Sequence, residues 1–194
     1  MKLNQLHNFI TAKLSSELSS QLTYHGVHHT LEVLQNCRQY IERLKLPESE
    51  SKLLQTAALM HDTGFLFTYK DHETESKRYA KEILPDWGYS DGQITKICNM
   101  IEATRIPQQP ASLSEKILAD SDLDYLGTEG FYKISETLFL ELVAFGLIDN
   151  RDEWDQLQIR FLEKHYYHTD YARDFREPVK QEHLRKLKEN QNSR

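Results

Sequence analysis

Three groups of histidine and aspartate could together bind a metal ion. They are Tyr24-His25 with His29, the doublet His61-Asp62, and the acidic segment 120–124. Imidazole nitrogens and carboxylate oxygens form a mixed donor set, which suits a borderline or hard divalent ion better than a thiolate site would. Such an ion lowers the pKa of a bound water and aligns it on a phosphoryl centre. The chemistry to look for is therefore metal-assisted hydrolysis.

The doublet ends an apolar helical run, and Gly64 then interrupts the helix. Ala57 lies one turn before His61 and Leu54 two turns before it, so the imidazole faces the side that should be buried. An unpaired buried polar group is costly, and a metal ion would satisfy His61 and Asp62 at once.

The other two groups leave alternatives open. His25 and His29 are one turn apart on one helical face, either as exposed polar residues or as parts of a site. In segment 120–124 the flanking apolar residues predict that at least one acid turns inward, whereas Asp124 is expected at the surface.

Long helices joined by short turns must position these groups. Seven glycines, five prolines and 28% charged residues fit such a chain. Apolar residues at helical spacing, with capping patterns at Ser90 and Ser112 and a predicted N-cap at Asp71, indicate an all-α fold. The predicted helices cover about 3–18, 26–44, 47–62, 71–84, 90–101, 112–124, 127–146, 154–162 and 184–187. We expect a single domain over 1–194, with a C-terminal helical extension over 150–194.

Charge and composition narrow the partners. A net charge of -6 and a pI near 5.8 argue against a nucleic-acid polymer or a membrane surface as partner. No apolar run reaches membrane-spanning length, and the N-terminus lacks the apolar core of a signal peptide. Cys37 and Cys98 are expected as buried free thiols, which fits a cytoplasmic protein. The aromatic-rich region 154–175 could form a homo-oligomer interface.

The order of these residues resembles a known family. His29, His61-Asp62 and Asp120 follow the H…HD…D pattern that names the HD superfamily of metal-dependent phosphohydrolases. Segment 24–29 is similar to the opening motif of cyclic-nucleotide phosphodiesterases and related bacterial HD proteins, segment 57–65 to AALLHDIGF, and segment 120–127 to DADLDYLG. The resemblance covers about residues 20–130 and implies a phosphodiesterase-like helical bundle with its HD core there.

The resemblance also implies roles. The expected metal ligands are His29, His61, Asp62 and Asp120. Asp62 would bridge to a second ion if one binds, and His25 would be the general acid that protonates the leaving alkoxide. Asp122 could instead hold a histidine in its tautomer. Tyr24 is a further candidate near the substrate.

Departures from the family pattern sharpen this expectation. Phe65 and Leu66 stand where some HD nucleotidases and alarmone hydrolases carry an acid, so a metal-bound hydroxide would be the nucleophile. Only His72 lies between the doublet and the last motif, which favours one tightly held divalent ion: Mn, Fe, Ni, Mg or Zn. His72-Glu73 could serve a weaker second site, orient a water, or simply begin a solvated helix.

The sequence thus predicts a phosphomonoesterase or phosphodiesterase for a small phosphorylated, possibly nucleotide-like, substrate. Thr104-Arg105 could meet a phosphate oxygen, or Arg105 could be a surface residue. A non-haem iron oxygenase and a non-catalytic ligand-sensing helical domain are the alternatives. The substrate does not follow from the sequence, because fold membership does not determine function.

Overall fold

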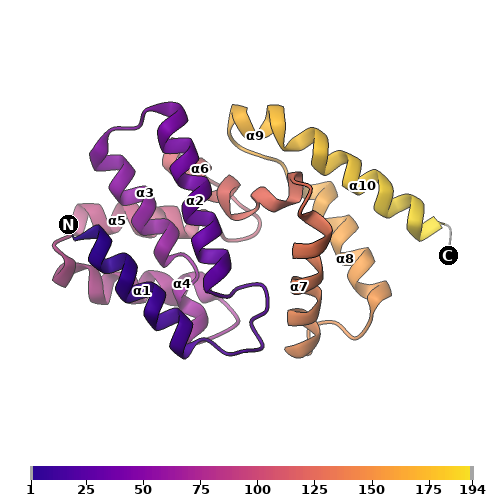
Figure 1. The fold of residues 1–194 in the computed structure, drawn as a ribbon, viewed down its shortest axis with the longest axis horizontal. Coiled ribbons are helices and arrows are strands. Elements are labelled where there is room, and N and C mark those ends of the chain that lie inside the picture. Colours follow the sequence, from indigo (N-terminus) through magenta and orange to yellow (C-terminus); the bar gives the residue numbers. More distant parts are fainter. Residues whose placement is uncertain (1, 193–194) are drawn as a thin grey trace. The chain divides into compact units, whose positions relative to one another are not determined.

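A computed structural model describes residues 2–192, and this part of the chain forms helices and no strand, which confirms the all-α prediction. The helices form two compact units (Figure 1). The first contains the N-terminal segment up to Ser19 and residues 25–122; the second contains residues 20–24 and the chain from Leu123 onward. The prediction of a single domain over 1–194 stays a prediction.

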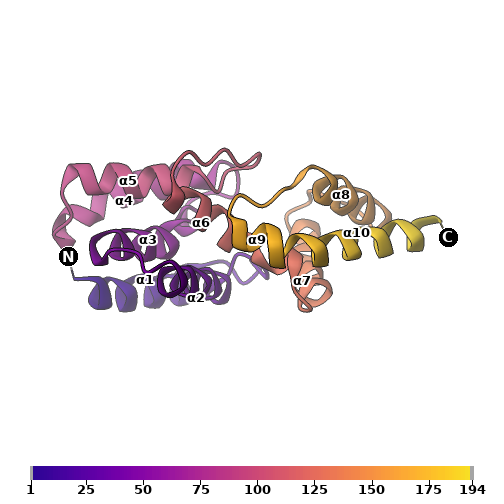
Figure 2. The same ribbon diagram turned by 90° about the horizontal axis from the view of Figure 1, so that it is seen from above.

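A central helix organises the first unit. The elements of this unit are α1 (Leu3–Glu17), α2 (Val27–Leu44), α3 (Glu48–Met60), the 3-10 turn η1 (Thr63–Leu66), α4 (His72–Ile83), η2 (Leu84–Trp87), α5 (Asp91–Glu102) and α6 (Leu113–Asp122). Helix α3 contacts α1, α2, α4, α5 and α6, and Figure 2 shows it between the α1–α2 and α4–α5 pairs. Every residue from Thr56 to Phe65 is buried. A helix that is apolar on nearly all sides at its C-terminal end is expected at such a central position.

Two of the three predicted helix starts show the expected bonds. The Ser90 N–H donates to Gln93 Oε1 at 2.9 Å, which confirms the capping box of α5. Ser112 and Glu115 exchange backbone-to-side-chain bonds of 3.3 Å at the start of α6. Asp71 occupies the N-cap position of α4 but adopts a left-handed backbone (φ 55°), and its carboxylate accepts from Arg105 instead.

The second unit is built around a mixed aromatic and aliphatic core. Its elements are η3 (Asp124–Gly127), α7 (Phe131–Ala144), α8 (Arg151–Lys164), α9 (Asp170–Phe175) and α10 (Glu177–Asn192). The buried core consists of Tyr24, Leu123, Tyr125, Leu126, Phe131, Ile159, Leu162, Tyr167, Ala172 and Leu184. Helix α9 was not predicted, and α10 is much longer than the predicted 184–187. Lys180 and His183 are buried on α10, so polar residues interrupt the apolar pattern that would have revealed its length.

Two further expectations concern the whole described chain. Cys37 and Cys98 are both buried free thiols, as predicted, and burial raises the pKa of Cys37 to about 12. Among the described helices, none combines the length and apolar character that a membrane span requires.

Candidate metal centre

Two imidazoles and one carboxylate converge where three helices of the first unit meet. His29 lies in the first turn of α2, His61 directly after α3, and Asp122 at the end of α6. His29 Nε2 lies 3.0 Å from Asp122 Oδ1 and 3.4 Å from His61 Nε2, and His61 Nε2 lies 3.4 Å from Asp122 Oδ1. Both histidines are buried. These three side chains offer ligand atoms close enough to one another to hold one metal ion.

The backbone of α3 sets the orientation of His61. Its Nδ1 lies 2.8 Å from the carbonyl oxygen of Ala58. A carbonyl oxygen only accepts, so Nδ1 must donate its proton there. In the neutral ring the lone pair is then on Nε2, the atom that faces His29 and Asp122. The helix end therefore presents His61 in the tautomer that a metal ligand needs.

Asp62 supplies a second carboxylate with an unsatisfied atom. Its Oδ2 lies 3.2 Å from His61 Nε2 and 3.5 Å from His29 Nε2, yet among the described residues this buried oxygen has no hydrogen-bond partner. Its Oδ1 lies 3.4 Å from His72 Nε2. A buried carboxylate oxygen without a hydrogen bond is costly. A divalent cation would satisfy it, and the nitrogen and oxygen donors around it fit such an ion.

The last-motif aspartate at the centre is Asp122, which corrects the choice of Asp120. Both residues lie in α6, where Asp120 is buried and Asp122 is half-buried. Two positions along a helix correspond to a rotation of roughly 200°, so the two side chains point to different sides. The structure therefore brings Asp122, and not Asp120, next to His29 and His61.

The electrostatics show how strongly these groups depend on one another. Burial lowers the pKa of His61, but Asp62 and Asp122 outweigh it and hold that pKa well above its ordinary value. Burial raises the pKa of Asp62, yet His61 and His72 bring it well below the usual range. The pKa of Asp122 is lowered to about 2, because bonds to His29 and His61 outweigh burial. Two ionised carboxylates thus share one buried pocket with imidazoles.

An aromatic stack lies beside the carboxylates. The ring of Phe65 stacks with that of His25, at a centroid distance of 4.3 Å, and with that of His72, at 4.0 Å, and the two imidazoles lie 5.9 Å apart. His25 is half-buried. His72 begins α4 and is half-buried, and because its Nε2 also approaches Asp62, it belongs to the surroundings of the centre. Glu73 is buried as well, with Oε1 3.9 Å from His72 Nε2.

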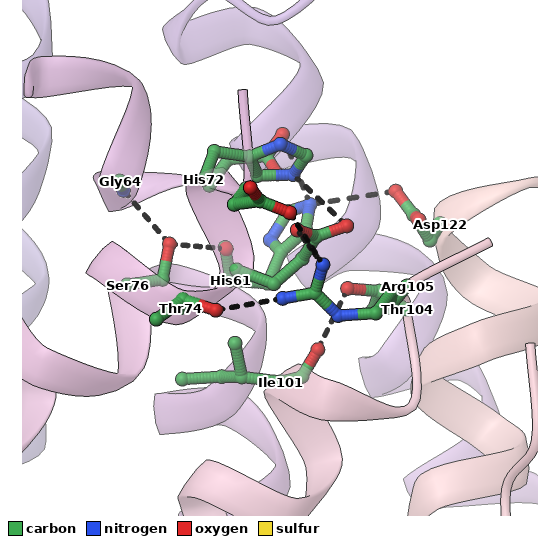
Figure 3. Close-up of polar contacts among 12 residues, drawn as sticks. His61, Gly64, His72, Thr74, Ser76, Ile101, Thr104, Arg105 and Asp122 are labelled. Atoms are coloured by element: carbon green, nitrogen blue, oxygen red, sulfur yellow. Dashed lines mark hydrogen bonds and ion pairs between the residues drawn. The ribbon is translucent and has the colours of Figure 1, made fainter. Parts of the chain in front are cut away.

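The remaining candidates have structural contacts. Arg105 pairs with Glu102 at 2.9 Å, Asp71 at 3.2 Å and Glu73 at 3.3 Å, and donates to Thr74 at 2.8 Å. Thr104 donates to the carbonyl of Ile101 at 2.8 Å (Figure 3). Tyr24 is buried in the second unit's core, where its ring packs 5.6 Å from Tyr125 and its N–H donates to Glu141.

Sequence reasoning missed one buried hydroxyl near the doublet. Ser76 on α4 bonds to the backbone of both His61 and Gly64 (Figure 3). The available signal was its spacing, because Ser76 lies four residues after His72 and so on the same face of α4.

Comparison with known proteins places the chain in a family. Its fold is similar to that of a predicted HD superfamily hydrolase from an uncultured Thermotogales bacterium, with 20% identity, coverage of 98% of this chain and 92% of that one, and a TM-score of 0.62. A protein from Lactobacillus plantarum is similar over the full length of both chains, at 18% identity and a TM-score of 0.68. No curated protein matches. The HD domain family model matches residues 26–124, which is more than half of the 194 residues, and the chain belongs to the HD domain family.

Proposed function

We propose that the protein is a metal-dependent phosphoric ester hydrolase for a nucleotide-like or other small phosphorylated substrate. One observation carries the proposal: the buried Oδ2 of Asp62 lies 3.2 and 3.5 Å from two imidazole nitrogens and has no hydrogen bond among the described residues. The similarity to the Thermotogales protein, a predicted HD superfamily hydrolase, supports the same reaction class.

His29, His61, Asp62 and Asp122 would hold the ion. When bound, a divalent cation polarises a phosphoryl oxygen and makes a water more acidic. These residues supply two neutral nitrogens and two negative carboxylates, which leaves a net charge close to zero around a divalent cation. The bond from His61 to the Ala58 carbonyl keeps one nitrogen in the right orientation throughout.

His25 is the proposed general acid. It is half-buried, and its ring lies 5.8 Å from that of His29 and 4.3 Å from that of Phe65. A position beside the centre lets an imidazole give a proton to a departing oxygen. Stacking on Phe65 restricts the ring to one plane. His72, whose ring lies 4.0 Å from that of Phe65 and 5.9 Å from that of His25, contacts Asp62 and would orient it.

Metal analysis and activity assays test the proposal together. Protein purified without chelator should contain about one divalent ion per chain and, with Mn, Ni or Mg, hydrolyse some member of a panel of phosphomonoesters and phosphodiesters. The Asp62→Ala variant should lose both properties. Equal and negligible metal content in both proteins would refute the metal centre; a metal-loaded wild type that cleaves no phosphoric ester would refute the hydrolase.

A leaving-group series tests the role of His25. The His25→Ala variant should retain its metal and lose on the order of 100-fold in turnover, the usual scale of general acid catalysis. The loss should be smallest for esters with good leaving groups such as nitrophenol, which need little protonation. An undiminished rate on an alkyl ester would refute this role.

The oxygenase alternative keeps one specific observation in its favour. His29, His61 and Asp122 form a two-histidine, one-carboxylate set, which is also the ligand set of many non-haem Fe(II) oxygenases. Oxygen uptake that rises with iron loading, without phosphatase activity, would decide for it. Metal or ligand binding with neither activity would favour a sensing domain.

A further inference from the structure

A single hydroxyl, that of Ser76, links two backbone groups on either side of Asp62. Ser76 is fully buried in the second turn of α4. Its Oγ donates to the carbonyl oxygen of His61 at 2.6 Å and accepts the N–H of Gly64 at 2.7 Å (Figure 3). Both backbone groups lie at the break between α3 and η1, one just before Asp62 and one two residues after it.

This break leaves backbone groups that an intact helix would pair. The last carbonyl groups of an α-helix and the first N–H groups of the next turn lack intrahelical partners. Here both are buried, so each would cost free energy if left unpaired. The hydroxyl of Ser76 pairs with the carbonyl of His61 and the N–H of Gly64, so the backbone on both sides of Asp62 is bonded to the same oxygen atom.

Gly64 allows α4 to approach the turn backbone to backbone. A Cβ on Gly64 would lie 1.8 Å from the carbonyl oxygen of His72, far closer than any side-chain atom can come. His72 and Ser76 are on one face of α4, one helical turn apart. The contact that places Ser76 against the turn therefore also brings His72 Nε2 to 3.4 Å from Asp62 Oδ1.

We infer that Ser76 is a positioning residue of the metal centre, whose hydroxyl holds the backbone of the ligand doublet in the orientation that metal binding requires. The inference rests on the metal centre proposed above. Ser76 contacts neither the ion nor the substrate in this role. Its effect reaches the ion through the main chain of His61 and the turn that carries Asp62.

Zinc titration of a matched pair of variants tests this role. Ser76→Ala removes the bridging hydroxyl, whereas Ser51→Ala removes a buried hydroxyl at the far end of α3, where Ser51 donates to the Leu46 carbonyl at 3.1 Å. Calorimetry should show zinc affinity about tenfold weaker in Ser76→Ala, at the low end of the loss seen when groups that support metal ligands are removed. Ser51→Ala should bind zinc as wild type does, although both variants melt at lower temperature. Unchanged affinity in Ser76→Ala, or an equal loss in both variants, would overturn the inference.

Two further measurements keep the test decisive. Ser76→Thr retains the hydroxyl and should recover affinity relative to Ser76→Ala; no recovery in a folded Thr variant would count against the hydroxyl. If Ser76→Ala does not fold, amide exchange in the wild type replaces it. Zinc should slow exchange of the Gly64 N–H far more than that of Ile94, which bonds to the Ser90 carbonyl at the start of α5. Equal slowing at both sites would refute the coupling.

The outcome also separates this inference from the proposed function. A wild type that binds zinc but cleaves no ester would refute the hydrolase, while the affinity comparison would still decide the role of Ser76. A wild type that binds no zinc would overturn the metal centre and the inference with it.

Discussion

Asp122 and Asp124 belong to one short segment and are both largely shielded from solvent, but Asp122 contacts histidines and Asp124 contacts an arginine. In the first unit, Asp122 Oδ1 lies 3.0 Å from His29 Nε2 and 3.4 Å from His61 Nε2. In the second unit, Asp124 Oδ1 accepts from Arg176 Nε at 2.8 Å. A guanidinium is always charged, whereas an imidazole is charged only when protonated.

The difference in partner separates a structural acid, Asp124, from the proposed metal ligand, Asp122. Asp124 and Arg176 neutralise each other at any physiological pH, so that pair needs nothing further. Asp122 and Asp62 instead hold two negative charges beside imidazoles, and their neutralisation requires protons or a cation. Burial alone does not identify a site, since Asp124 is only 7% exposed. The expectation that Asp124 would lie at the surface was therefore wrong.

Replacing Asp122 should have the largest effect. Asp122→Asn keeps the side-chain size but removes the negative charge and one ligand oxygen. We expect metal affinity to fall by more than about 100-fold, beyond the loss caused by changes in supporting residues. Calorimetric titration with Zn or Mn measures this. Turnover should fall in parallel at limiting metal, and unchanged affinity would remove Asp122 from the ligand set.

The matched change at Asp124 should affect stability instead. Asp124→Asn leaves the guanidinium of Arg176 without its carboxylate, with 23% of the arginine side chain exposed. We expect a loss of about 1–3 kcal/mol, less than for a fully buried pair because water reaches Arg176. Urea unfolding of the metal-free protein measures it. Metal affinity should stay within about twofold of wild type, because the Asp124 carboxylate is paired with Arg176 within the second unit; a large affinity loss here would break the distinction between the two aspartates.

This pair also shows how far sequence reasoning reaches. The all-α class and the α5 and α6 caps follow from helical periodicity and from residues close in sequence, whereas the grouping of His29 with His61-Asp62 follows only from the resemblance to HD proteins. The choice between Asp120 and Asp122 does not, because either can face inward until the rotation of α6 is known. Arg176 lies 52 residues beyond Asp124, and only tertiary packing brings them together. Ser76 was missed for the same reason: its partners are main-chain atoms on another element.

Metal affinity should rise with pH in the range where His61 is protonated. In the metal-free protein the pKa of His61 is well above its ordinary value, so binding must displace a proton from it. Loss of one proton makes the affinity rise about tenfold per pH unit below that raised pKa. Zinc titrations near pH 6 and pH 7 in two buffers of different ionisation enthalpy measure the slope and the protons released. Asp124→Asn should show the same slope, and a flat profile would contradict proton displacement.

The raised pKa of His61 also determines whether the metal-free protein gains or loses stability as the pH rises. A raised folded-state pKa contributes stability that is fully present below the ordinary pKa of about 6.5 and is lost as pH rises through the folded-state value. Metal-free protein should therefore lose stability as His61 deprotonates beside Asp62 and Asp122. Saturating zinc should abolish this decline, because the cation then replaces the proton. Urea unfolding at a series of pH values, with and without zinc, compares the two profiles.

The smallest effect is expected at Arg105, whose side chain is 30% exposed and divides its contacts among the exposed acids Glu102 and Asp71 and the buried Glu73, which also lies 3.9 Å from His72 Nε2. Exposed pairs of this kind contribute about 0–1 kcal/mol each. Arg105→Gln should therefore destabilise the protein by about 1 kcal/mol or less, measured by urea unfolding. Its KM for a phosphoric ester should change less than about threefold, because the guanidinium is already engaged at the start of α4. A tenfold rise in KM at unchanged stability would instead show that Arg105 leaves these acids to bind the substrate phosphate. Arg105 would then be a substrate-binding residue, unlike the structural Arg176 and unlike the proposed metal ligands.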